Sequence, residues 1–262
     1  MMSASRPGPK ARMAAGETLF GVWLELGSPM VAEVLAECGY DCAMMDMEHG
    51  PHSIGDTIGM MQAMKGTGCL PLTRIPQNDP VAIKRVLDAG VRGVMVPSVN
   101  TAEEAEAAVA ACRYPPRGKR GYAASIVRAS RFGLDLDDYL SRFEAEELLV
   151  ICQIETCEAV ENIESIAAVD GVDLLFIGPN DLAADAGLFN RLDAPEVDAM
   201  VTRVEEACRA AGRGLGAIVS PNRSLAQLKA SGGYRMILQD ADVALLRDSA
   251  RASLEAQRKA WG

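Results

Sequence analysis

The sequence lacks the features of several classes of protein. Its net charge is −10, which argues against a surface that binds nucleic acid or an anionic membrane. No apolar run approaches the length of a membrane span. The seven cysteines are scattered and form no Cys-x-x-Cys pair, which is typical of a reduced, intracellular protein. We therefore expect a cytoplasmic protein without nucleic-acid or membrane partners.

The first fifteen residues also lack an apolar segment, although they contain Arg6, Lys10 and Arg12. Because a signal peptide needs such a segment, we expect residues 1–15 to be a flexible tail. No linker rich in Pro, Gly or Ser divides the rest, so residues 16–262 are predicted to form one domain. With 49% hydrophobic residues, the chain can bury a sizeable core.

Apolar runs alternate with amphipathic helical runs along this domain. Eight runs have the pattern of buried parallel strands, at residues 19–26, 42–47, 70–75, 93–99, 148–154, 172–177, 215–219 and 234–238. Eight strand–helix units in about 250 residues predict an α/β fold of the (β/α)₈ TIM barrel type. An open, doubly wound sheet is the alternative, but the first strand is not followed by a Gly-x-Gly-x-x-Gly loop. Residues 114–138 are the longest irregular stretch and are predicted to be a lid or a subunit contact.

Two carboxylates follow neighbouring predicted strands. Glu155 comes directly after the strand at 148–154, and Asp181 follows the strand at 172–177. The carboxyl ends of barrel strands meet where such folds bind ligands. Two hard oxygen donors at this place suit Mg²⁺ or Mn²⁺. The sequence therefore predicts a divalent metal site, with an ion-pair network at the barrel rim as the alternative.

Residues beside these carboxylates are candidates for the same pocket. Gln153 points to the same side of its strand as Glu155, because side chains alternate along a strand. Gly178 and Pro179, which precede Asn180, can bring the backbone close to a ligand, although Gly-Pro is also common in ordinary turns.

The second and third predicted strands end in residues suited to proton transfer and anion binding. His49 follows the second strand, and Asp46 could hold its imidazole in one tautomer and raise its basicity, as a general base requires. Arg74 ends the third strand and offers a fork of donors to a substrate carboxylate and a developing enolate. A structural histidine and a salt bridge at the rim are the alternatives.

No lysine ends a predicted strand, which argues against the imine chemistry of a Schiff-base aldolase. A metal, an arginine and a His–Asp pair together favour another reaction. A 2-oxo acid chelated by the metal would lose a proton from C3, and the resulting enolate would attack an aldehyde.

Several motifs, in order along nearly the whole chain, resemble those of the HpcH/HpaI aldolase/citrate lyase family. The most specific are Asp46-x-Glu48-His49-Gly50-Pro51, Gln153-Ile154-Glu155-Thr156 and Phe176-Ile177-Gly178-Pro179-x-Asp181-Leu182. The resemblance implies a class II pyruvate aldolase on a TIM barrel. It also implies a homohexamer, a trimer of dimers in which the last helix is exchanged.

The resemblance assigns roles to the candidate residues. Mg²⁺, Mn²⁺ or Co²⁺ would be held by Glu155 and Asp181. Arg74 would stabilise the enolate, and His49 with Asp46 would transfer protons. Glu48 would hold these catalytic side chains in position without contacting the metal itself. Gln153 would lie beside the bound pyruvate, and the backbone at Gly178, Pro179 and Asn180 would line the 2-oxo acid site.

Two features leave the acceptor aldehyde open. Glu25 ends the first predicted strand, and the segment 239–242 follows the last one; both differ from the pattern expected of the family. An acid at position 25 could repel acidic aldehydes or bind a polyhydroxy one.

Two other functions are possible for such a chain. An acyl-CoA thioester lyase of the citrate-lyase or malyl-CoA type should carry a basic nucleotide-binding surface, which this acidic sequence does not obviously offer. A non-catalytic barrel that binds 2-oxo acids would show binding without turnover.

Overall fold

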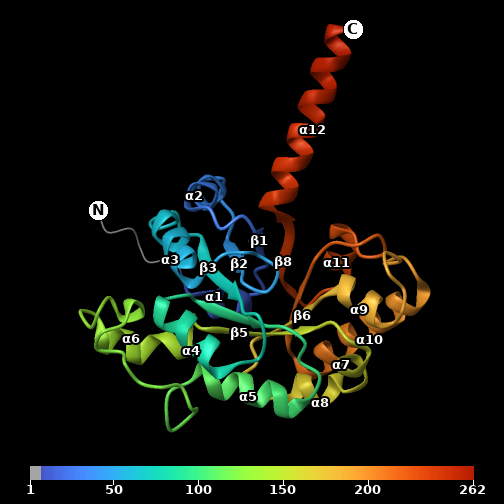
Figure 1. Cartoon of the computed structure of the whole chain (residues 1–262). Helices are drawn as coiled ribbons and strands as arrows, with labels where there is room; N and C mark the ends of the chain where they lie inside the picture. The colour runs from blue at the N-terminus through green and yellow to red at the C-terminus, as the bar shows by residue number, and fades with distance from the viewer. Residues whose placement is uncertain (1–6) are drawn as a thin grey trace.

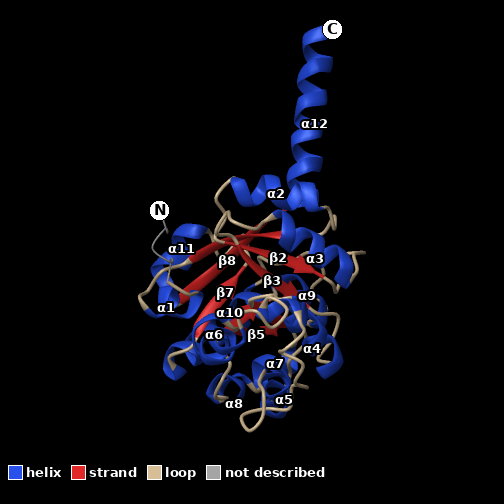
Figure 2. Cartoon of the chain, turned by 90° about the vertical axis from the view of Figure 1, so that its left-hand side faces the viewer, coloured by secondary structure: helices blue, strands red, loops and turns tan. Residues whose placement is uncertain are grey.

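Eight parallel strands close into a barrel in the order of the sequence (Figures 1 and 2). This computed structural model describes residues 7–262. The strands are β1 (Leu19–Leu24), β2 (Cys42–Asp46), β3 (Leu70–Arg74), β4 (Gly93–Val96), β5 (Leu149–Ile154), β6 (Leu174–Ile177), β7 (Gly214–Ala217) and β8 (Tyr234–Ala241). Each overlaps the run predicted for it. Because β1 pairs with β8, the sheet is closed, which confirms the TIM barrel rather than the open sheet.

Helices alternate with the strands and cover the outside of the barrel. They are α2 (Pro29–Glu37), α3 (Ile54–Ala63), α4 (Pro80–Ala89), α5 (Ala102–Cys112), α6 (Leu136–Arg142), α7 (Cys157–Glu161), α8 (Ile163–Ala168), α9 (Pro179–Asp185), α10 (Pro195–Ala211) and α11 (Leu225–Ser231). Several of these helices begin at an N-cap residue. The side chains of Ser28, Asp79 and Thr101 accept hydrogen bonds from backbone N–H groups in the first turns of α2, α4 and α5.

The strands bury both of their faces, which explains their nearly continuous apolar sequences. One layer of side chains packs between the strands and the outer helices. A second layer fills the inside of the barrel and ends in two aromatic rings, Trp23 and Phe176. These rings pack edge to face, with centroids 5.9 Å apart. They form a rigid apolar layer inside the barrel, below the carboxyl ends of the strands.

Part of the predicted flexible tail is a packed helix. Residues 1–6 lie outside the described residues, but α1 (Pro9–Ala14) places Met13 in the inner layer of the barrel. Arg12 is buried and donates from Nε to Glu17 Oε2 at 2.9 Å, and from a terminal nitrogen to Asp41 Oδ1 at 2.6 Å. The prediction of a tail was wrong for residues 9–14, because the contact of Arg12 with Asp41 and the packing of Met13 involve residues that are distant in sequence.

The segment between α5 and β5 contains the predicted irregular stretch. It includes a 3₁₀ turn at Arg128–Ser130 and a π-helical turn at Phe143–Glu147 on either side of α6. The first of these is flanked by exposed apolar side chains, among them Ile126, Phe132 and Leu134.

The last helix, α12 (Asp242–Trp261), leaves the barrel and projects away from it (Figures 1 and 2). Asp242 is buried at its start, whereas residues 245–262 are all exposed. The exposed residues include Leu246, Leu254 and Trp261, the last of which is 94% accessible. No helix within residues 7–262 is long and apolar enough to cross a membrane.

Candidate active site

A cavity of about 360 Å³ lies at the carboxyl ends of the strands. It brings together most of the residues predicted from the sequence: His49, Arg74, Gln153, Gly178, Pro179, Asn180 and Asp181. Asp46, Glu48 and Glu155 contact these residues directly. The carboxyl end is where TIM barrels carry their chemistry, so the fold and the predicted residues indicate the same place.

Glu155 is held by hydrogen bonds to both of its oxygens. Oε1 accepts from the backbone N–H of Ser98 at 2.7 Å and from its hydroxyl at 3.0 Å, and Oε2 accepts from the Gln153 amide. The carboxylate is only 4% exposed. Burial raises its pKa, the bonds from Ser98 oppose that shift, and the negative charge of Asp181 adds to it. A cation between Glu155 and Asp181 would relieve both the burial and the repulsion.

Asp181 comes from the next strand–helix unit. It lies in the first turn of α9, directly after β6, and its side chain is exposed. β5 and β6 are hydrogen-bonded neighbours, with Ile154 opposite Ile177, so the chain brings the two acids to one side of the cavity.

Gly178 leaves space beside these acids. A Cβ atom at this position would lie 2.9 Å from both Glu155 Oε2 and Gln153 Nε2. Gln153 Oε1 is buried without a hydrogen-bond partner among residues 7–262. The pocket thus offers carboxylate oxygens and an unpartnered amide oxygen, and no side chain at position 178 crowds them.

This donor set fits a hard divalent cation that keeps positions for substrate and water. Within residues 7–262, no group of three or more His, Cys, Asp or Glu side chains is arranged to hold a metal. Mg²⁺ is commonly bound through one or two carboxylates together with water and substrate oxygens. Glu155 and Asp181 match this pattern of two carboxylates, whereas residues 7–262 form no closed structural metal site.

Arg74 is fixed from three sides. Its Nε donates to Asp46 Oδ1 at 2.9 Å and a terminal nitrogen donates to Asp46 Oδ2 at 2.5 Å. Nε also lies 3.2 Å from Glu48 Oε2, and the guanidinium stacks 4.5 Å from the centroid of the Trp23 ring. Burial opposes the charges, but the pairing raises the pKa of Arg74 and lowers that of Asp46. Arg74 therefore presents a fixed positive charge to the cavity.

The predicted contact between Asp46 and the His49 imidazole is not formed. Besides Arg74, the Asp46 carboxylate accepts hydrogen bonds from the backbone N–H groups of Glu48 and His49, at 3.0 and 3.4 Å. Asp46 thus shapes the turn after β2, while the His49 side chain is exposed at the cavity. The sequence places Asp46 three residues before His49, which suggested the contact. It could not show that Arg74, on the next strand, donates to both oxygens of the Asp46 carboxylate.

The other histidine, His52, has a structural position. It is buried against Gly27, whose Cβ would lie 2.6 Å from that of His52, and it does not line the cavity. Burial lowers the pKa of His52, which favours its neutral form.

Sequence reasoning missed two contributors to the site, Ser98 and Trp23. Ser98 has a left-handed backbone conformation, with φ of 50°, which directs its N–H and hydroxyl to Glu155. Trp23 supports Arg74 and donates from its indole nitrogen to the carbonyl of Leu238 at 3.1 Å. Both follow from contacts between separate strands, for which the sequence carries no local signal.

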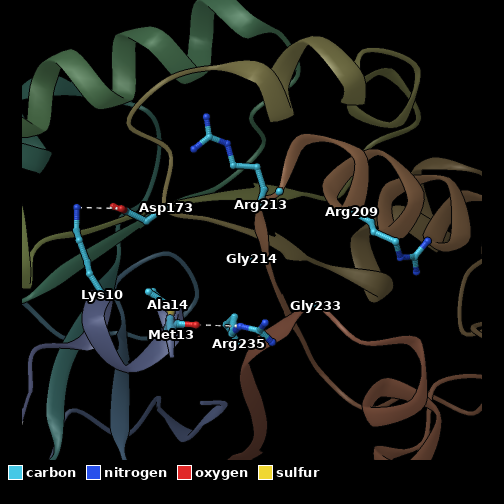
Figure 3. Close-up of a pocket in the computed structure, with 10 residues that line it drawn as sticks. Lys10, Met13, Ala14, Asp173, Arg209, Arg213, Gly214, Gly233 and Arg235 are labelled. Atoms are coloured by element: carbon cyan, nitrogen blue, oxygen red, sulfur yellow. Dashed lines mark hydrogen bonds and ion pairs between the residues drawn. The ribbon is translucent and has the colours of Figure 1, made fainter. Parts of the chain in front are cut away.

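A second hollow, of about 440 Å³, lies at the opposite end of the barrel (Figure 3). It is lined by several basic side chains, but these are bound within the chain. Lys10 pairs with Asp173 at 2.9 Å, Arg213 donates to three backbone carbonyls, and Arg235 donates to the carbonyl of Met13. The amino-terminal end therefore serves stability, as is usual in this fold.

Comparison with known proteins shows the family of this chain. Residues 19–247 match the HpcH/HpaI aldolase/citrate lyase family. The hydroxypyruvate/pyruvate aldolase of Chromohalobacter salexigens is 39% identical over 235 residues, which cover 90% of this chain and 91% of the relative. The 4-hydroxy-2-oxovalerate aldolase of Novosphingobium aromaticivorans is 43% identical over 237 residues, covering 89% and 87%.

A solved structure extends this agreement to three dimensions. The crystal structure of an HpcH/HpaI aldolase/citrate lyase family protein from Burkholderia cenocepacia J2315 has a TM-score of 0.88 and 38% identity. It covers 95% of this chain and 98% of that one. The family resemblance predicted from the motifs is thereby confirmed, and the chain belongs to the HpcH/HpaI aldolase/citrate lyase family.

Proposed function

We propose that this protein is a divalent-metal-dependent aldolase that catalyses the reversible addition of a 2-oxo acid enolate, such as that of pyruvate, to an aldehyde. The observation that carries the proposal is one site in which a buried carboxylate, Glu155, an exposed one, Asp181, and a fixed arginine are brought together. A cation suits the carboxylates, and the arginine suits the negative charge that develops on an enolate oxygen.

Glu155 and Asp181 would hold the cation, Mg²⁺, Mn²⁺ or Co²⁺. The cation would act as a Lewis acid that polarises the 2-oxo group. Gln153 would hydrogen-bond to the bound acid, and the backbone at Gly178, Pro179 and Asn180, where Gly178 has no side chain, would line the place of that acid.

Arg74 would stabilise the enolate oxygen with the donor that its own contacts leave free. Asp46 uses Nε and one terminal nitrogen, while the other terminal nitrogen makes no hydrogen bond to residues 7–262. Glu48 and Trp23 keep the guanidinium in place. Because the donor is positioned before the reaction, little reorganisation is needed when charge develops.

His49 would transfer protons at the mouth of the cavity. It is an exposed imidazole on the cavity wall, and histidine is the side chain that most often serves as a general acid or base. Asp46 would act on this step by fixing the turn that carries His49 rather than by contact with the imidazole.

We further propose a homohexamer built as a trimer of dimers that exchange α12. Leu246, Leu254 and Trp261 lie in the part of α12, residues 245–262, that is exposed throughout, and they support a second copy as the partner. The seven free cysteines support a reducing, cytoplasmic location.

The first half of the reaction can be tested without knowledge of the aldehyde. The protein is incubated with pyruvate in D₂O, and the methyl signal is followed by NMR with Mg²⁺ or Mn²⁺ and then with a chelator. We expect deuterium uptake that depends on the metal. If no metal supports uptake and no aldehyde is condensed, the proposal is wrong; turnover of acyl-CoA substrates would then favour a thioester lyase.

A further inference from the structure

The wall of the cavity opposite the metal-binding acids carries a carboxylate of its own. Glu25 directly follows β1 and lines the cavity together with Gln239 and Ala241 from β8. In a barrel with strands in sequence order, β1 lies across from β5, which precedes Glu155. If the 2-oxo acid binds at Glu155 and Asp181, as proposed above, the aldehyde approaches the side of Glu25.

The position of Glu25 is fixed by a buried residue at the start of α12. Asp242 is 3% exposed and accepts hydrogen bonds from the backbone N–H groups of Glu25, at 2.9 Å, and Leu26, at 3.1 Å. Two charge-assisted bonds to consecutive amides hold the chain at this point. The backbone that carries Glu25 is therefore held in a defined position in the cavity wall.

The side chain of Glu25 is partly buried, close to the charges of Asp46 and Arg74. Burial, followed by the charge of Asp46, raises the pKa of Glu25 to about 7, although Arg74 opposes the shift. Glu25 therefore has a carboxylic acid form and a carboxylate form near neutral pH, and it becomes mainly a carboxylate at pH 8.5.

The same wall offers no positive group to a second carboxylate. Of the lysine and arginine residues within the described chain, only Arg74 lines the cavity, and it is already paired with Asp46. The polar groups available are the Glu25 carboxyl and the Gln239 amide, whose oxygen accepts from the backbone N–H of Val219 at 2.8 Å. Such groups suit hydroxyls, which both donate and accept hydrogen bonds.

We propose that Glu25 determines the acceptor specificity of the enzyme: it favours uncharged aldehydes with hydroxyl groups and rejects aldehydes that carry a carboxylate. An acidic acceptor would bring a second negative charge against Glu25 without a counter-ion. A hydroxyaldehyde would instead hydrogen-bond to it.

This proposal rests on the proposed function, and the experiment keeps the two apart. The full chain, loaded with Mn²⁺ at pH 8.5, is given pyruvate with either glycolaldehyde or glyoxylate, which are similar in size but differ in charge. The kcat/KM for each is measured by NMR of the product. The quantity of interest is the glyoxylate-to-glycolaldehyde ratio, because effects on the enolate step cancel in it.

Three variants test the ratio. Glu25→Gln, which removes the charge and keeps the shape, should raise it about tenfold or more, as expected for a removed like-charge contact. Glu25→Asp, which keeps the charge, should leave it close to that of the unmodified protein. Glu33→Gln on the exposed face of α2 makes the same charge change away from the cavity and should not move it.

The outcomes separate the two proposals. An unchanged ratio in Glu25→Gln, with deuterium exchange of pyruvate intact in the unmodified protein, overturns the role of Glu25 and leaves the aldolase standing. An equal rise in Glu25→Asp also overturns it, because the loss of the contact rather than of the charge would then be responsible. Absence of both exchange and condensation in the unmodified protein overturns both proposals.

Discussion

Replacing Arg74 with lysine separates the charge of this side chain from its geometry. Lysine keeps the positive charge but has a single ammonium, so it cannot make both hydrogen bonds to Asp46 and cannot stack flat on Trp23. A hydrogen bond to a charged group contributes about 1.5–3 kcal/mol, and the stacking about 0.5–1 kcal/mol. We therefore expect Arg74→Lys to lower the free energy of unfolding by about 2–4 kcal/mol.

The same substitution should slow the reaction. If Arg74 stabilises the enolate oxygen from a fixed position, a lysine that is no longer held by Asp46 and Trp23 places its charge less well. Loss of one preorganised donor to an oxyanion costs about 100–1,000-fold in kcat. We expect a loss of this size in the metal-dependent deuterium exchange of pyruvate.

Urea unfolding at equal protein concentration measures the first effect, and kcat and KM of the exchange measure the second. Arg203→Lys on α10 is the control, because the Arg203 side chain is exposed and its contacts to Glu164 and Glu161 lie on the surface. Such a pair contributes about 0–1 kcal/mol. A loss confined to KM in Arg74→Lys would refute the enolate role and show that Arg74 only binds the substrate carboxylate.

Three further predictions follow from other parts of the structure. Glu155→Gln should weaken Mn²⁺ binding by more than about 100-fold, measured by electron paramagnetic resonance, since it removes one of two carboxylate ligands; unchanged affinity would contradict the metal assignment. The pKa of Glu25 is raised from 4.5 to about 7, so its contribution to the free energy of unfolding is complete below pH 4.5 and lost as pH rises through 7. In Glu25→Gln, this decrease in the free energy of unfolding between pH 4.5 and 7, measured by urea unfolding, should be lost. An equal decrease in the variant and in the unmodified protein would contradict the prediction. Deletion of residues 248–262, which keeps the Asp242 contacts, should reduce the mass measured by sedimentation, whereas a full-size oligomer would exclude α12 from assembly.

The barrel could be predicted from the sequence because its strands are buried on both faces. A strand such as β5 is apolar throughout, so its existence and its carboxyl end are visible in the sequence, and with them the place of Glu155. The same reasoning located Asp181 after β6 and Arg74 at the end of β3. Whether a residue lies at the end of a strand depends on the residues next to it in the chain, so it can be predicted from a single sequence.

The partners of those residues could not be predicted in the same way. Asp46 bonds to Arg74, 28 positions away, rather than to the imidazole of His49 nearby. Ser98 reaches Glu155 through a left-handed turn after β4. Helix α1 is held by contacts of Arg12 and Met13 with distant residues. Each of these depends on which strands become neighbours, and that is fixed only when the barrel closes.

The charges at the site explain how an acidic protein can act on an anionic substrate. Five carboxylates and one guanidinium line the cavity or lie directly behind it: Glu25, Asp46, Glu48, Glu155, Asp181 and Arg74. Burial is the leading cause that raises the pKa of Glu25, Glu48 and Glu155, and neighbouring acids add to it. A bound divalent cation would offset part of this excess at the β5–β6 side, where the 2-oxo acid would bind. The β1 side would gain no such cation: Arg74 is the positive side chain near Glu25, and it is held by Asp46. One cavity thus has two halves, one that accepts an acid once the cation is present and one that favours a neutral partner.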